Sequence, residues 1–216
     1  MKMSKKIYFP VGIGIVIISI VLIINLDTNE KTNFEPTLAL DFTYEDGNSN
    51  IKKTLEGTGI SMSSPIKLST PGNVEKFCSF FTDEDIQKLV EYCTSTELLD
   101  KDGNFLGNIH MVGTHDLPKL VLVVIQTDPF MNNLPEIKSV FGSVIENLVC
   151  SCWEELKPSG IENIDEWIDR HREFHLDAIR THSKSNLNLE GKQLQIEITT
   201  NTEGYLWKLF VATHST

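Results

Sequence analysis

Residues 119–126 read "KLVLVVIQ", and this run decides the fold. Between Lys119 and Gln126 every residue is apolar, and most are β-branched. A strand with one face in water alternates apolar and polar side chains, whereas a strand that is apolar at every position needs cover on both faces. The run therefore predicts the central strand of a sheet that has a packed layer on each side.

The segments around this run predict further strands joined by short turns. Residues 96–113 read as two strands about an Asp-Gly turn. Residues 192–200 alternate apolar and polar positions, and residues 205–214 follow a turn as a closing strand. Near the start of the domain, residues 37–62 alternate weakly and predict a hairpin of two strands.

Two longer helices are expected between these strands. Residues 133–156 begin with Asn133 as a cap and Pro135 in the first turn. Residues 160–182 follow a capping box of Ser159 and Glu162. Shorter helices are predicted within residues 73–81 and 82–93, and no helix or strand is assigned to residues 183–191. The order of elements predicts an α+β domain with a mostly antiparallel sheet packed against a helical hairpin.

The amino-terminal region differs from this domain. Residues 7–26 are apolar except for a few positions and follow three lysines. A helix of that length spans a hydrocarbon core of roughly 30 Å, and the run is longer than a signal peptide requires and lacks a small-residue cleavage site. We therefore expect a cytoplasmic segment at 1–6, a single transmembrane helix at 7–26, a linker at 27–36 and an extracytoplasmic domain at 37–216, in a single-pass protein of the cell membrane.

The charge of the chain limits its partners. The formal net charge is −11, and all 30 acidic residues follow residue 26. Such a domain repels nucleic acid and anionic lipid headgroups and favours cationic partners or ions. The only partner that the sequence identifies is the lipid bilayer, through residues 7–26.

Four cysteines permit disulfides on the oxidising side of a membrane. Cys78 and Cys93 flank a short predicted helix, so they are either bridged or buried as small apolar side chains. Cys150 and Cys152 lie two apart on the predicted helix 133–156. They would point away from each other and could not both bind one ion.

Three histidines fall on the apolar face of the predicted helix 160–182. His171 and His182 are eleven residues apart, about 16 Å along a helix, too far for one metal ion. His171 and His175, one turn apart, could bind zinc or copper with a third ligand such as His110, His115 or His214. The alternative is a set of hydrogen-bonded core or interface histidines, with His182 in the last helical turn.

No catalytic set can be recovered from the remaining motifs. Nucleotide-binding loops and nucleophile elbows are missing, and residues 100–111 lack the Gly and Glu of a calcium loop. The sequence specifies no cofactor and argues against an enzyme. It favours a membrane-anchored binding or assembly module of the cell envelope. The alternative is an anchored metal-binding protein or metal-dependent enzyme that uses His171 and His175. A third hypothesis is a structural subunit of a surface assembly.

Overall fold

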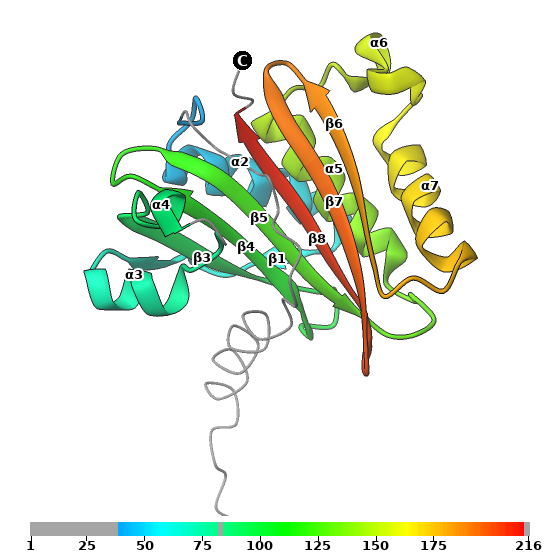
Figure 1. Cartoon of the computed structure of the whole chain (residues 1–216), viewed down its shortest axis with the longest axis horizontal. Coiled ribbons are helices and arrows are strands. Elements are labelled where there is room, and N and C mark those ends of the chain that lie inside the picture. The colour runs from blue at the N-terminus through cyan, green and yellow to red at the C-terminus, as the bar shows by residue number, and fades with distance from the viewer. Residues whose placement is uncertain (1–38, 82–83, 214–216) are drawn as a thin grey trace, which may run out of the picture.

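A single eight-stranded antiparallel sheet forms the centre of the domain in the computed structural model, which describes residues 39–81 and 84–213 (Figure 1). The strand order is β1-β3-β4-β5-β8-β7-β6, and β2 also pairs with β3. The strands are β1 (Ser61–Met62), β2 (Ile66–Leu68), β3 (Tyr92–Leu99), β4 (Phe105–Gly113), β5 (Pro118–Thr127), β6 (His182–Leu189), β7 (Lys192–Asn201) and β8 (Gly204–Thr213). This confirms the predicted α+β class.

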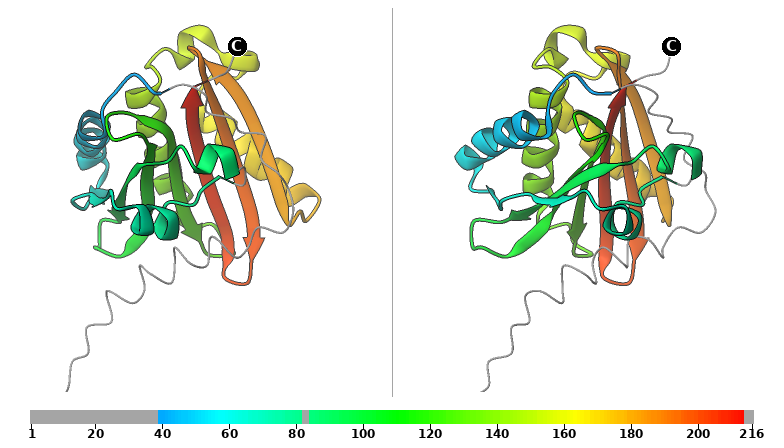
Figure 2. Two further views of the ribbon diagram at one scale, coloured as in Figure 1. Left: turned by 60° about the vertical axis from the view of Figure 1, so that its left-hand side comes forward. Right: turned by 90° about the vertical axis from the view of Figure 1, so that its left-hand side faces the viewer.

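Strand β5 lies in the middle of the sheet and is buried on both faces, as its sequence predicts. Val121, Val123 and Ile125 belong to the larger core, whereas Leu122 and Val124 belong to a second core on the opposite face. The larger core lies beneath α2 (Tyr44–Leu55), α5 (Leu134–Leu148) and α7 (Ile164–Asp177), and the second beneath α3 (Pro71–Phe77) and α4 (Glu84–Gln87). Figure 2 shows the two layers on either side of the sheet.

The two long helices α5 and α7 pack against each other on the larger core. Along the chain, α5 and α7 are separated by α6 (Trp153–Leu156) and the short 3-10 helix η2 (Pro158–Gly160). Helix α5 ends at Leu148, eight residues before the predicted end. Helix α7 is capped by Asn163, whose side chain accepts a hydrogen bond from the Glu166 amide, so the predicted capping box was wrong.

The predicted hairpin at residues 37–62 is also wrong, because Tyr44–Leu55 in the middle of this segment form helix α2. The Thr43 hydroxyl caps that helix by accepting a hydrogen bond from the Asp46 amide, and acidic residues occupy its first turn and lysines its last. Asn48, Ile51 and Leu55 are buried at helical spacing. These helical signals outweigh the short alternation that precedes them, and only Ser61–Met62 forms a strand.

Two further predictions are corrected around the sheet. Residues 183–191 received no helix or strand from the sequence, but most of them belong to β6, the edge strand that pairs with β7. Helix α4 has four residues, and Tyr92 and Cys93 belong to β3 instead of a longer helix. Helix α7 ends at Asp177, so His182 lies in β6 and not in a helical turn.

The predicted segments 1–6, 7–26 and 27–36 lie outside the described residues. Among the helices of residues 39–81 and 84–213, none has the length and apolar character needed to cross a membrane.

Candidate functional site

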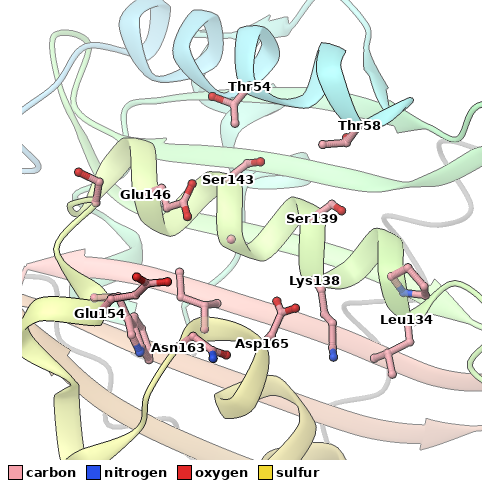
Figure 3. A pocket seen from close by; sticks show the side chains of 15 residues that line it. Thr54, Thr58, Leu134, Lys138, Ser139, Ser143, Glu146, Glu154, Asn163 and Asp165 are labelled. Carbon is pink, nitrogen blue, oxygen red and sulfur yellow. The ribbon is translucent and has the colours of Figure 1, made fainter.

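The outer side of α5 forms the floor of an open groove of about 860 Å³ (Figure 3). Thr54 on α2 and Thr58 on the following 3-10 helix η1 (Glu56–Thr58) lie on one side, and the segment from Ser151 to Asp165 forms the other side. Two contacts hold the walls to the floor. Asn147 on α5 donates a hydrogen bond to the Thr54 hydroxyl at 3.0 Å, and Lys138 pairs with Asp169 on α7 at 2.7 Å.

The groove is open because the residues on its floor are small. Ser139, Gly142 and Ser143 line it at helical spacing, and a Cβ atom added at Gly142 would meet nothing within 4 Å. Bulkier side chains at these positions would fill the space between α2 and α7. The floor presents hydroxyl groups that can donate and accept hydrogen bonds.

The charge of the groove is negative. Glu146, Glu154 and Asp165 contribute three carboxylates, whereas Lys138 contributes the one amine among the lining residues. Because Lys138 is already paired with Asp169, it does not neutralise these carboxylates. Figure 3 shows Glu146 and Glu154 near one end of α5 and Asp165 nearer the middle. The arrangement suits an extended cationic ligand better than a single ion.

His171 and His175 lie on the buried face of α7, where a chain of hydrogen bonds holds their rings. The Thr200 hydroxyl donates to the Arg180 carbonyl at 2.8 Å and so accepts from His175 Nε2 at 2.9 Å. His175 Nδ1 then accepts from the Ser183 hydroxyl at 2.8 Å, and Ser183 accepts from His171 Nε2 at 3.3 Å. Each imidazole in this chain is neutral.

Burial keeps these imidazoles neutral. It lowers the pKa of His171 to about 4, with smaller contributions from neighbouring groups. Burial, followed by the positive charges of His182 and Arg180, also lowers the pKa of His175. Both rings therefore act as hydrogen-bonding parts of the core at neutral pH. This arrangement was considered from the sequence as the alternative to metal binding.

The proposed third metal ligands lie elsewhere. His110 is buried in β4 beside Phe80 and faces the second core, and His115 is exposed and lies 3.3 Å from Glu91. His214 is outside the described residues. Within the part of the chain that the structure describes, no group of three or more His, Cys, Asp or Glu side chains could hold a metal ion. Metal binding by His171 and His175 stays a prediction.

Two disulfides occur in the described residues. Cys78 and Cys93 are joined within the second core, one of the two arrangements considered from the sequence. Cys150 and Cys152 are also joined. The expectation that they point apart assumed a helix through residue 156. Because α5 ends at Leu148, the two cysteines lie in a turn where their sulfur atoms meet.

Sequence reasoning did not find the groove because four separate segments form it. The available indication was the small residues Ser139, Gly142 and Ser143 at helical spacing, which also fit close helix packing. Comparisons of the chain with protein-family models, curated proteins and solved structures find no match. Its class is thus defined by its own structure: an α+β domain with an antiparallel eight-stranded sheet and an acidic groove over one helix.

Proposed function

We propose that this protein is a membrane-anchored extracytoplasmic binding module whose α5 groove holds a cationic, extended ligand. The observation that carries the proposal is the groove itself, about 860 Å³ in volume and lined by three carboxylates and several hydroxyls. Ligand sites are concave and are commonly of this size. A Lys- or Arg-rich segment of another envelope component has the length and charge to occupy it.

The charge of the whole chain supports the same class of ligand. A formal net charge of −11 attracts cations over distances longer than direct contact, and this raises the rate of association at low salt. The three groove carboxylates then provide local contacts. No step of this function requires bond chemistry, so the proposal is a binding role and not an enzyme.

The anchoring part of the proposal rests on the sequence. Residues 7–26 would cross the cell membrane once, with residues 1–6 inside and the domain from residue 37 outside, tethered by the linker 27–36. Two disulfides in the domain support placement on the oxidising side. Protease added to intact cells should degrade the domain. Protection of the domain, or a mature chain that begins after residue 26, would contradict this topology.

Binding of a fluorescent oligolysine to the full-length protein in mild detergent tests the groove. The triple variant Glu146→Gln, Glu154→Gln, Asp165→Asn should weaken binding at least tenfold, because it removes the local carboxylates but keeps their shapes. Tenfold corresponds to about 1.4 kcal/mol. Anisotropy titrations at two salt concentrations measure the effect, since screening weakens contacts between exposed charges.

A control variant separates the groove from net charge. Glu75→Gln, Asp102→Asn, Glu203→Gln removes the same charge at exposed positions outside the groove lining. It should change the affinity by less than about twofold, because distant exposed charges are largely screened. Equal weakening by both triple variants, or no binding of oligolysine to the unchanged protein, would refute the proposal.

The alternatives from the sequence lack a supporting observation. An anchored metal-binding protein would need a third ligand beside His171 and His175, and the described residues provide none. Metal analysis of the purified protein tests that prediction directly. A structural subunit of a surface assembly would reveal itself as a stable oligomer in detergent.

A further inference from the structure

The two disulfides of the domain lie in contrasting surroundings. Cys78 and Cys93 are fully buried and join the end of α3 to β3 across a separation of 15 residues. Cys150 and Cys152 are only two residues apart and partly exposed, in the turn between α5 and α6. The first bond is enclosed by the second core, whereas the second is only half-buried at the margin of the larger core.

The Cys150–Cys152 bond contributes less to folding than the Cys78–Cys93 bond. The stabilisation from a disulfide comes mainly from the loop that it closes in the unfolded chain, and a separation of two residues closes a much shorter loop than one of 15. The turn is also held without it. The Cys150 amide donates to the Ile145 carbonyl at 3.2 Å, the Leu156 amide donates to the Cys152 carbonyl at 2.9 Å, and the indole of the buried Trp153 donates to the Ile161 carbonyl at 3.2 Å.

The position of this bond places it beside the groove. Ser151, between the two cysteines, is exposed and lines the groove. Trp153, which directly follows Cys152, is buried and also lines the groove. A molecule in the groove would therefore lie beside the disulfide. Exposed disulfides that are not needed for folding are the ones that exchange readily with thiols.

We propose that Cys150 and Cys152 form a redox-active disulfide that oxidises a dithiol outside the cytoplasm. One thiolate of the dithiol attacks a sulfur of the Cys150–Cys152 bond. That bond breaks, its electron pair leaves on the other cysteine as a thiolate, and a mixed disulfide forms. The second thiol of the partner, once deprotonated, attacks its own sulfur in the mixed disulfide and releases the remaining cysteine thiolate.

This exchange is balanced. The partner dithiol loses two electrons and two protons and becomes a disulfide, and Cys150 and Cys152 gain both and become two thiols. The reaction needs no other oxidant for one turnover. It rests on the proposed extracytoplasmic location, but it does not require a cationic ligand, so it can fail separately from the proposed binding role.

Graded dithiothreitol, followed by alkylation of the folded full-length protein in mild detergent, tests the inference. Mass spectrometry then identifies which cysteines are modified. Cys150 and Cys152 should be alkylated at dithiothreitol concentrations at least tenfold below those that open Cys78–Cys93, and one dithiothreitol should be oxidised per chain. The melting temperature should fall less than it does when Cys78–Cys93 opens. Opening of both disulfides together, opening only on unfolding, or cysteines at 150 and 152 that stay reduced in excess oxidised glutathione would overturn the proposal.

Paired variants supply the controls. Cys150→Ser, Cys152→Ser should abolish exchange at low dithiothreitol and should lower the melting temperature less than Cys78→Ser, Cys93→Ser does. Cys78→Ser, Cys93→Ser should retain the exchange. If this second variant does not fold, the alkylation pattern of the unchanged protein decides the question alone. Oligolysine binding, measured in parallel, shows whether the groove proposal fails separately.

Discussion

Acidification should destabilise the domain through His110, a buried histidine on β4. Its side chain is 1% exposed and packs 4.9 Å from the Phe80 ring, measured between centroids. Its Nε2 atom has no hydrogen-bond partner among the described residues. Burial alone lowers the pKa of His110 from 6.5 to about 4, because a charged imidazole would lie in an apolar layer without compensation.

The direction and size of the effect follow from this pKa. Because the folded pKa is below the unfolded one, the stabilising contribution is fully present above pH 6.5 and is lost as the pH falls towards 4. One pKa unit corresponds to about 1.4 kcal/mol, so the complete loss is about 3 kcal/mol. At pH 5 the folded protein should be less stable than at pH 8 by about 2 kcal/mol from His110 alone.

Chemical denaturation of the unchanged protein and of His110→Phe, each at pH 8 and pH 5, measures this contribution. The free energy of unfolding of the variant should fall less between the two pH values, by about 2 kcal/mol. At pH 8 the variant should be at least as stable, since the new ring removes an unpaired buried nitrogen. His115→Phe is the matched control at an exposed position and should keep the full pH dependence. An unchanged pH dependence in His110→Phe would refute the reasoning.

Four further variants test the packing, the buried disulfide and the hydrogen-bond network by chemical denaturation. Ser183→Ala should destabilise the domain by about 1 to 3 kcal/mol, because it leaves two buried imidazole nitrogens without their shared partner. An unchanged free energy of unfolding would mean that water or another group replaces the hydroxyl. Cys78→Ala, Cys93→Ala should cost about 3 kcal/mol from the lost loop constraint, and a loss below about 1 kcal/mol would show that the unfolded chain is already compact. Gly107→Ala should cost about 1 to 3 kcal/mol, since its Cβ atom would lie 2.1 Å from a carbonyl oxygen of β5. Gly142→Ala, at an open position of α5, should be neutral or stabilising, and similar losses for both glycines would contradict the packing.

The parts of the fold that the sequence predicted correctly are those with a strong, continuous pattern. The uniformly apolar residues 120–125 lie in the central strand, and the Asp-Gly turn joins β3 and β4. The prediction for 37–62 was wrong, and the strand within 183–191 was not predicted, because each pattern was weak. Residues 183–189 are polar at most positions, and they form a strand because pairing with β7 satisfies their backbone groups.

The candidate site was likewise predictable from the sequence only in part. The helical spacing of His171 and His175 placed both on the buried face of α7, and the structure confirms their burial. Their partners Ser183 and Thr200 come from β6 and β7, and no spacing in the sequence links those residues to the helix. The Cys150–Cys152 bond likewise depends on where α5 ends, which the apolar pattern alone does not fix.

By itself, the sequence determined the α+β class, the central strand and the buried face of α7. Each of these depends on periodicity along one segment, which sets the side chains that a helix or strand can present to a core. Only the tertiary structure decided the groove over α5, the histidine network and the pairing of all four cysteines. Those features arise where segments distant in the sequence meet or where a helix ends, and packing of the whole domain sets both.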